Sequence, residues 1–226
     1  LYDAEIQFTE DLLARVLGAL DRTGVRDNTL IVFTADHGES LYDRDTYFGH
    51  GRYLYDEEIL VPLLFHCPAM LPTGMVIDEQ VETIHIAPTI LDFLELPPEP
   101  SFQGMSLMNI IDPGSRPEAV DGSAGTHVQH PPEEKPAFSI NHRGRMVRFG
   151  GWKYIELDDE LGTEELYDLR IDPGETDNLV LSEKEKAAEL RALLREWNAS
   201  VPVVRSDSYE LDDESMRALR ALGYVD

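Results

Sequence analysis

The chain opens with a periodic pattern of apolar and polar residues that is typical of an amphipathic helix. Apolar residues recur every three or four positions, which places them on one face of an α-helix. They are Ile6, Leu12, Leu13, Val16, Leu17 and Leu20. Thr23 and Gly24 follow, and glycine is common just beyond a helix end. The spacing therefore predicts a helix over 1–22.

Two apolar runs after this helix predict β-strands. Residues 29–35 are continuously apolar with β-branched members, which is typical of a strand buried on both faces. Residues 61–65 form a second run, in which Pro62 marks a strand start or a sheet edge. A short helix with Pro88 in its first turn is predicted over 84–94. A helix that leads into a buried strand is half of a parallel unit, so this part predicts a doubly wound parallel sheet of the α/β class.

The remainder of the chain contains an irregular segment followed by a series of predicted strands. Residues 97–136 contain many prolines and glycines, so we expect an irregular connection and a domain boundary there. Short runs with the two-residue period of strands follow, separated by glycine or acidic turns, and they predict an antiparallel sheet. These runs are 137–140, 145–149, 152–157 and 165–169.

A second amphipathic helix is predicted over 181–197. Its apolar face consists of Ala188, Leu190, Leu193, Leu194 and Trp197. This face can cover one side of the antiparallel sheet. Residues 200–226 are expected to form a tail that ends in a short helix.

The composition indicates a folded protein and excludes some classes of binding partner. Hydrophobic residues make up 42% of the 226 positions, enough to bury one large core or two smaller ones. The 44 acidic and 19 basic residues give a net charge of −25. Such a charge repels nucleic acid and anionic membranes, so we expect neither as a partner. The apolar runs stop short of the roughly 20 residues that a membrane span requires.

The residues that end the predicted strand 29–35 are the first candidates for chemistry. Asp36 and His37 offer a carboxylate oxygen and a ring nitrogen at the carboxyl end of a strand, where open α/β sheets keep their binding sites. Such a pair can bind one divalent cation, and Gly38 lets the backbone turn away closely. A hard cation such as Ca²⁺ takes roughly 6–8 oxygens, so further ligands must come from elsewhere. The alternative, that Asp36 caps a turn and His37 is an ordinary loop residue, fits the pattern equally well.

A further candidate lies in the glycine-flanked segment Gly49-His50-Gly51. The glycines allow the loop to approach a ligand closely. The imidazole of His50 can donate a hydrogen bond to an anion or protonate a leaving oxygen. Arg52 is near enough in the sequence to help neutralise negative charge.

Other notable residues are interpreted as structural. Cys67 continues an apolar strand, and we expect it to be inert packing. Lys153 alternates with aromatic residues, which is typical of the solvated face of a strand. The run 172–175 has the composition of a turn. His127 and His130 invite comparison with a two-histidine metal site, but exposed loop histidines are the favoured interpretation because no carboxylate or cysteine completes a recognisable spacing.

Four segments, read in order, resemble the C-terminal half of sulfatases of the alkaline-phosphatase superfamily. They are TLIVFTADHGESL, YFGHGRYLYDEEILVPLLF, HIAPTILDFLELP and GGWKYIELDDELGTEELYDLRIDPGETDNL. The resemblance implies the C-terminal part of a catalytic α/β domain at 1–96 and the irregular connection at 97–136. It also implies a small subdomain at 137–199, with a four-stranded antiparallel sheet and a helix, and a tail at 200–226.

The same resemblance implies roles for the candidate residues. Asp36 and His37 are metal ligands, and His50 is the catalytic basic group that contacts sulfate, a position that many relatives fill with lysine. Arg52 is assigned to substrate binding beside it. The expected cation is Ca²⁺, with Mn²⁺ and Mg²⁺ as alternatives. The family's nucleophile is a formylglycine in a Cys/Ser-x-Pro-x-Arg signature, and that signature is absent here because the segment after Cys67 has Leu71 in place of the arginine.

The activity implied by the resemblance is that of a sulfuric ester hydrolase similar to arylsulfatases. We expect the full-length enzyme to release inorganic sulfate from a small-molecule or glycan ester. This chain is then a C-terminal piece, inactive without the N-terminal half, and the family slightly favours a periplasmic or secreted location. The alternatives are a phosphonate or phosphodiester hydrolase, a phosphoethanolamine transferase of the same superfamily, and a non-catalytic relative that binds sulfated glycans.

One position departs from the family pattern. His85 precedes Ile-Ala-Pro-Thr, where relatives usually have Asp. If that Asp only caps the helix, its replacement costs about 1 kcal/mol and no activity. If it tunes the pocket, we expect a different substrate range.

Overall fold

The computed structural model describes residues 2–42, 47–112, 135–201, 215–217 and 219. The chain divides into two compact units, Leu1–Leu194 and Arg195–Asp226. The boundaries proposed at 96, 136 and 199 stay predictions. His127, His130 and most of the tail lie outside the described residues. Within the described part, no helix is both long enough and apolar enough to span a bilayer.

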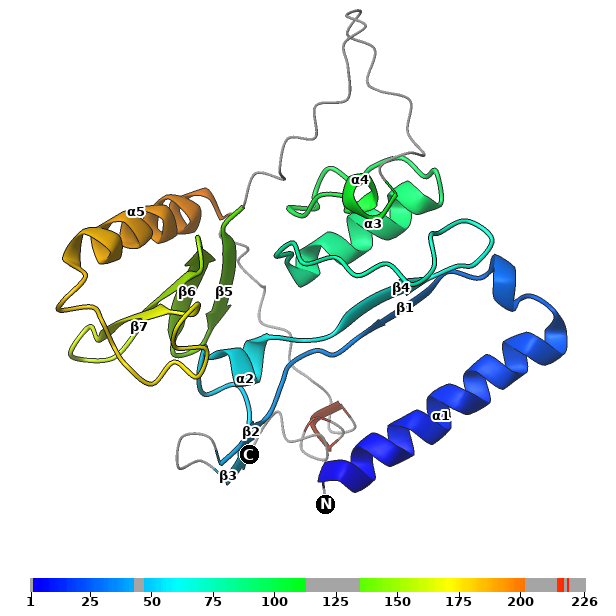
Figure 1. Ribbon diagram of the computed structural model, residues 1–226, viewed down its shortest axis with the longest axis horizontal. Helices are drawn as coiled ribbons and strands as arrows, with labels where there is room; N and C mark the ends of the chain where they lie inside the picture. The colour runs from blue at the N-terminus through cyan, green and yellow to red at the C-terminus, as the bar shows by residue number, and fades with distance from the viewer. Residues whose placement is uncertain (1, 43–46, 113–134, 202–214, 218, 220–226) are drawn as a thin grey trace, which may run out of the picture. The chain divides into compact units, whose positions relative to one another are not determined.

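The helices and strands predicted for the first part of the chain are present, with ends shifted by a few residues (Figure 1). The described order is α1 (Tyr2–Thr23), η1 (Arg26–Asn28), β1 (Ile31–Thr34), β2 (Ser40–Leu41), β3 (Tyr47–Gly49), α2 (Asp56–Ile59), β4 (Leu63–His66), η2 (Thr83–His85), α3 (Ile86–Phe93) and α4 (Met108–Ile111). The predicted elements are α1, β1, β4 and α3, and the structure adds shorter elements that were not predicted, including α4 inside the segment expected to be irregular. The strands β2 and β3 pair with each other as an antiparallel ribbon. This ribbon and α2 fill the connection between β1 and β4.

The pairing of β1 with β4 corrects the predicted parallel arrangement. The two strands run antiparallel, with Ile31 opposite His66 and Thr34 opposite Leu63. A parallel neighbour requires a crossover connection, usually a helix packed across the sheet. The connection here holds only the four-residue helix α2, and it returns the chain beside β1 in the opposite direction. The length of the connection suits either arrangement, so the sequence alone did not distinguish them.

The prediction that β1 is buried on both faces is also wrong for the described residues. Leu63 and Phe65 of β4 pack against a core cluster that includes Cys67, which is 2% exposed as predicted. The opposite face carries Phe33 and Leu64, which are 38% and 53% exposed. Burial on both faces requires a helix layer on each side of the sheet, and α1 contributes no buried residue.

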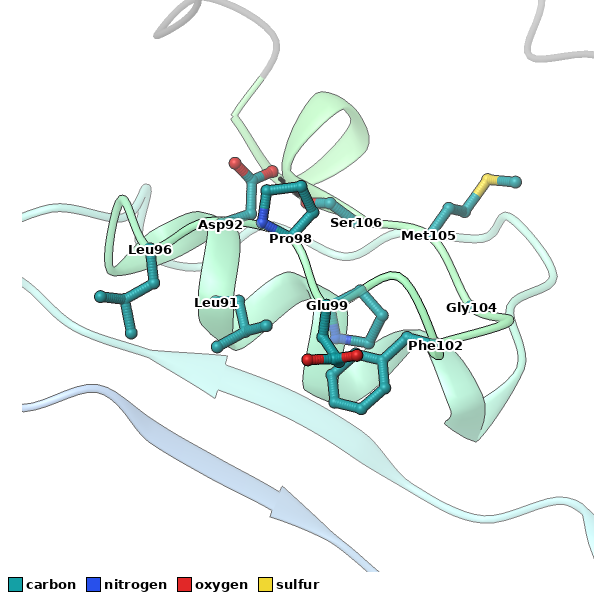
Figure 2. A pocket seen from close by; sticks show the side chains of 10 residues that line it. Leu91, Asp92, Leu96, Pro98, Glu99, Phe102, Gly104, Met105 and Ser106 are labelled. Carbon is teal, nitrogen blue, oxygen red and sulfur yellow. Dashed lines mark hydrogen bonds between the residues drawn. The ribbon is translucent and has the colours of Figure 1, made fainter.

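The helix α3 and the segment after it line an open pocket of about 410 Å³ (Figure 2). Its walls are largely apolar and include Leu91, Leu96 and Phe102. At one side, the Ser106 hydroxyl donates a hydrogen bond to the Asp92 carboxylate. This bond ties the segment that leads to α4 onto α3.

The second part of the chain confirms the predicted antiparallel sheet. Its strands are β5 (Ala137–Asn141), β6 (Gly144–Phe149), β7 (Trp152–Leu157) and β8 (Glu164–Asp168), paired in the order β5-β6-β7-β8. The helix α5 (Lys184–Ser200) follows. Its buried residues are Ala187, Leu190 and Leu194, whereas the predicted Ala188 is exposed.

The antiparallel sheet is covered on both faces. On one face, Val147, Tyr154 and Leu166 are neighbours in the strand register and are fully buried. Arg191 of α5 donates a hydrogen bond of 3.1 Å to the Tyr154 hydroxyl, which places α5 on this face.

The opposite face packs against the segment that contains α2. Met146, Ile155 and Tyr167 form a core cluster there with Leu54 and Tyr55. Because side chains alternate along a strand, Lys153 shares the face of Ile155. The prediction that Lys153 is solvated is therefore wrong, and its side chain is 0% exposed. The sequence did not reveal that residues distant along the chain cover this face.

The packing of α5 gives the first testable expectation. Leu190 is 0% exposed and Leu181 is 82% exposed. Because truncation of a buried leucine removes apolar contacts and leaves a cavity, Leu190→Ala should lower the free energy of unfolding by about 2–5 kcal/mol. Leu181→Ala should change it by less than about 0.5 kcal/mol. Urea unfolding followed by circular dichroism measures both, and equal losses in the two variants would contradict this packing.

Candidate functional site

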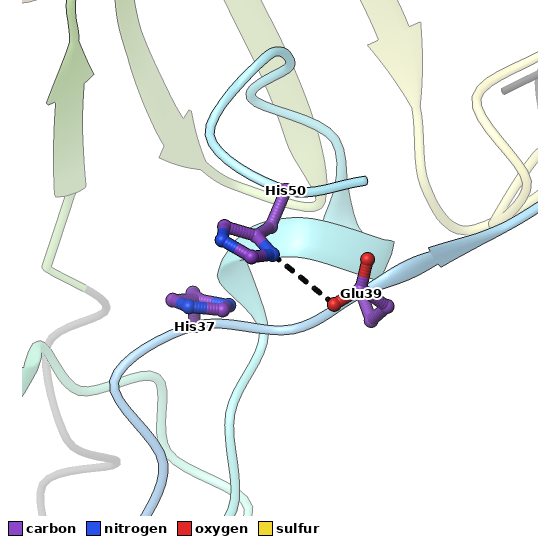
Figure 3. A group of neighbouring side chains, drawn as sticks. All are labelled: His37, Glu39 and His50. Carbon is purple, nitrogen blue, oxygen red and sulfur yellow. Dashed lines mark hydrogen bonds and ion pairs between the residues drawn. The ribbon is translucent and has the colours of Figure 1, made fainter. Parts of the chain in front are cut away.

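Two histidines from separate segments meet beyond the end of β1 (Figure 3). The rings of His37 and His50 are stacked, with centroids 4.0 Å apart and planes inclined by 22°. His50 follows β3, and His37 follows β1. Glu39 lies beside them, with its Oε2 atom 3.1 Å from His50 Nδ1. The donor atoms of His37, Glu39 and His50 all lie within 4.8 Å of one another.

The hydrogen bonds of the two rings determine which nitrogen is available to a ligand. His37 Nδ1 lies 2.7 Å from the Gly38 carbonyl oxygen, and His50 Nδ1 lies 3.1 Å from the Glu39 carboxylate. Since both partners are acceptors, each Nδ1 carries the proton and donates it. Nε2 is then the nitrogen that each ring can present to a cation or substrate. Histidines that bind metals are commonly oriented in this way.

The predicted metal ligands Asp36 and His37 lie side by side. Asp36 Oδ1 accepts a hydrogen bond of 3.0 Å from the His37 backbone N–H, and Asp36 Oδ2 lies 3.6 Å from His37 Nε2. A carboxylate oxygen and a ring lone pair at this separation repel each other unless a proton or a cation lies between them. The two donor atoms therefore fit the role of neighbouring ligands to one divalent cation. They supply only part of a calcium shell, which takes roughly 6–8 ligands.

Gly38 is required by a close approach of two chain segments. Its N–H donates a hydrogen bond of 2.7 Å to the Glu58 carbonyl oxygen of α2. A Cβ atom at this position would lie 2.0 Å from the Glu57 carbonyl oxygen. The backbone turn expected after His37 therefore packs directly against α2.

Arg52 was predicted as a substrate-binding residue, whereas Glu39 was not predicted at all. Arg52 joins this region through its backbone N–H, which donates 3.0 Å to Glu58 Oε2, and its side chain is exposed. The described contacts do not bring its guanidinium to the histidines. Glu39 was not predicted, although it stands two positions after His37 in the same run. A carboxylate so close to a strand-end histidine was the signal that could have identified it.

Comparison with known proteins places the chain among relatives. A family model described as "Sulfatase" matches residues 1–96. The chain is 32% identical over 201 residues to a sulfatase of Formosa agariphila, covering 88% of this chain and 36% of that protein. It is 28% identical over 224 residues to arylsulfatase K of Xenopus laevis, covering 96% of this chain and 41% of that protein. Residues 1–96 therefore match the sulfatase family, and the similarity to named sulfatases extends over most of the chain.

Solved structures confirm this placement and the mixed α/β fold class. The structure of BT4656 in complex with its substrate D-glucosamine-2-N,6-O-disulfate is similar, with a TM-score of 0.69 and 25% identity, over 86% of this chain and 39% of that one. The phosphonate monoester hydrolase of Agrobacterium radiobacter is similar with a TM-score of 0.64 and 25% identity, over 82% and 38%. The chain thus spans well under half the length of the sulfatases and structures that it matches.

His85, the position that departs from the sulfatase pattern, lies away from the histidine pair. It is the N-cap of α3 but makes no side-chain capping bond. Its Nδ1 accepts a 3.4 Å contact from the Met105 N–H, and its Nε2 lies 3.9 Å from Glu82 Oε2. The ring lines a cavity of about 500 Å³ that also includes Lys135 and Arg148, and none of His37, Glu39 or His50 lines it.

The environment of His85 shifts its protonation. Burial lowers the pKa of the His85 imidazole, and the nearby Lys135 ammonium lowers it further. Burial raises the pKa of the neighbouring Glu82 carboxyl, an effect that a hydrogen bond from the Phe138 N–H opposes. The folded chain therefore favours a neutral ring at His85.

This preference predicts a pH-dependent stability. Because the folded state binds the His85 proton more weakly than the unfolded chain, its contribution is complete above the ordinary value of 6.5 and is lost as the pH falls through the lowered folded pKa. The free energy of unfolding should therefore decrease below pH 6.5, and His85→Asn should make the decrease shallower. Urea titrations at several pH values measure it, with the exposed His142→Asn as the control. An unchanged slope in His85→Asn would contradict the assignment.

Proposed function

We propose that the protein to which this chain belongs hydrolyses sulfate esters, with the His37–His50 pair at the sulfuryl group. The match of residues 1–96 to the sulfatase family and the similarity to named sulfatases support this activity. The observation that carries the proposal is the orientation of the two stacked rings, each with Nδ1–H held by a protein acceptor and Nε2 left for a ligand. An unprotonated Nε2 suits a cation, as proposed for His37, whereas Nε2 of a positively charged His50 ring can donate a hydrogen bond to an anion and then transfer its proton.

A divalent cation, Ca²⁺ first, is proposed at Asp36 Oδ2 and His37 Nε2. When bound, it would neutralise the sulfate oxygens and orient the ester. Asp36 is 69% exposed in its side chain, so it can take such a ligand without breaking buried packing. Mn²⁺ and Mg²⁺ are the alternatives. The remaining ligands would come from water, from the substrate or from residues outside the described chain.

His50 is proposed to act on the ester oxygen and Arg52 to bind the sulfate charge. His50 Nε2 would donate a hydrogen bond to a sulfuryl oxygen, or transfer a proton to the leaving oxygen as the S–O bond breaks. The Glu39 carboxylate at 3.1 Å would stabilise the positively charged ring. The net reaction converts R–O–SO₃⁻ and water into R–OH and HSO₄⁻. The nucleophile and the first acidic ligands would lie outside these residues, in keeping with the 36% of the Formosa agariphila sulfatase that the chain covers.

A sulfated sugar is the proposed substrate class. Its support is the similar structure of BT4656, which holds D-glucosamine-2-N,6-O-disulfate. The second candidate is phosphonate monoester hydrolysis, favoured by the similarity to the Agrobacterium radiobacter enzyme. Sulfuryl and phosphoryl transfer place similar demands on cations and hydrogen-bond donors. A non-catalytic relative would bind the sulfated sugar without releasing sulfate.

Sulfate release from a chromogenic aryl sulfate tests the proposal. The full-length protein, produced together with a formylglycine-generating enzyme, should release sulfate in the presence of Ca²⁺ and lose this activity with a chelator. Asp36→Ala should remove the response to Ca²⁺, and His50→Ala should lower kcat by about 100- to 10,000-fold because a general acid is lost. His142→Ala, at an exposed histidine, is the matched control. Release that is unaffected by both Asp36→Ala and His50→Ala would refute these roles.

The 226 residues alone provide a complementary expectation. Without a nucleophile, this chain should release no sulfate above background from the same substrate, with or without Ca²⁺. Isothermal titration with a sulfated sugar would show whether binding persists. Turnover at an enzyme-like rate by the isolated chain would contradict the assignment of the nucleophile to another part of the protein.

A further inference from the structure

The short helix α2 contacts both loops that carry the site histidines. The Glu58 carbonyl oxygen accepts the 2.7 Å hydrogen bond from Gly38, which adjoins His37. The Glu58 carboxylate accepts hydrogen bonds from the backbone N–H groups of Arg52 and Tyr53, at 3.0 and 3.1 Å, just after the segment of His50. Glu58 is 3% exposed. Hydrogen bonds to Glu58 therefore fix the backbones of both loops relative to α2.

The antiparallel sheet holds α2 through a buried ion cluster of Asp56, Lys153 and Glu175. Lys153 Nζ lies 2.6 Å from Asp56 Oδ1 and 2.6 Å from Glu175 Oε1. Lys153 Nζ also donates 3.2 Å to the Leu54 carbonyl oxygen. Lys153 is 0% exposed and Glu175 is 1% exposed, so neither charge has water as an alternative partner.

Glu175 also caps the N-terminus of α2. Its Oε2 accepts a 2.7 Å hydrogen bond from the Asp56 N–H, and the N-cap residue Tyr55 provides no side-chain bond of its own. Glu175 has φ of 53°, in the left-handed region that residues with a Cβ rarely adopt. A helix of one turn is not stable in isolation, so α2 depends on such tertiary contacts.

A second connection from the sheet reaches the His50 loop directly. The Asn141 side-chain amide at the end of β5 lies 3.3 Å from the Gly51 carbonyl oxygen and 3.2 Å from the Tyr53 carbonyl oxygen, and it donates to both. Gly51 adjoins His50 in the sequence and has φ of 72°. The loop is thus fixed at two carbonyl oxygens by one side chain of the sheet.

We propose that Lys153, Glu175 and Asn141 are positioning residues that hold His37 and His50 in their stacked arrangement. This inference rests on the proposed function, because it assigns the antiparallel sheet a part in the chemistry of that site. The sheet would act through α2 on both loops and through Asn141 on the His50 loop alone. None of the three residues needs to touch the substrate.

The test separates the arrangement of the histidines from the activity. In the full-length protein with ¹⁵N-labelled histidine, His37→Gln and His50→Gln assign the two ring signals. Wild type should show Nδ1–H tautomers at both rings and ring-to-ring nuclear Overhauser effects. Glu175→Gln and Asn141→Ala should shift the tautomer balance and weaken the ring-to-ring effects. In both variants, the kcat of sulfate release should fall by about 10- to 100-fold, and KM should change much less. Small displacements of reacting groups slow catalysis.

Glu164→Gln is the matched control. Glu164 pairs with Arg191 of α5 and accepts a hydrogen bond from Tyr154, on the face of the sheet away from α2. This variant also removes an ion pair of the same subdomain, but it should leave the histidine signals and kcat unchanged. If Glu175→Gln does not fold, Asn141→Ala decides, because it leaves the buried charges intact.

Two results would overturn the inference. One is wild-type histidine signals in folded Asn141→Ala and, where it folds, in Glu175→Gln. The other is an equal disturbance of the signals in Glu164→Gln, which would indicate general loosening. Altered histidine signals in a protein that releases no sulfate from any substrate would instead refute the proposed function and leave the positional coupling in place.

Discussion

The buried ammonium of Lys153 is the constraint on which the candidate site depends. A charge without access to water is tolerated only when opposite charges and hydrogen-bond acceptors surround it, and Asp56, Glu175 and the Leu54 carbonyl oxygen provide them. Because these partners come from the α2 segment and from the turn after β8, the three segments can only be buried together. This requirement fixes the position of α2. The hydrogen bonds of α2 in turn fix the two loops that bear His37 and His50.

The negative charge of the chain is compatible with an anionic substrate because the site is locally organised. The net charge of −25 would repel a sulfate ester at long range, but salt screens such a field beyond roughly 10 Å. Close to the substrate, two imidazoles and the proposed cation would determine the interaction. The Glu39 carboxylate accepts the hydrogen bond of His50 Nδ1 and thereby orients this ring.

The periodicity of the sequence predicted the helices and strands well, because the spacing of apolar residues reports local conformation directly. It did not predict the direction of the β1–β4 pairing, which depends on how the connection between them folds. It also misplaced Lys153, because alternation along β7 separates two faces without indicating whether a distant segment covers either of them. The same limit applies to the 172–175 turn, whose structural interpretation was sound but did not anticipate that Glu175 reaches α2.

The candidate site was predictable to the extent that its residues stand in one motif. Asp36 and His37 adjoin in the sequence and remain adjacent in space, and the glycines beside His50 marked the second loop. The sequence could not predict the stacking of His37 on His50, because the stacking depends on the contacts of Glu58 and Asn141 with the two loops. Arg52 was assigned by sequence proximity, and the structure anchors its backbone while leaving the side chain exposed.

A crystal structure of the full-length protein grown with Ca²⁺ and a sulfated sugar would show whether Asp36, His37 and His50 form the binding site. We expect the cation, identified by its anomalous scattering, on Asp36 and His37, with the sulfate group within hydrogen-bonding distance of His50 Nε2. A cation and a sulfated sugar bound elsewhere, with His37 and His50 in contact with neither, would contradict this expectation.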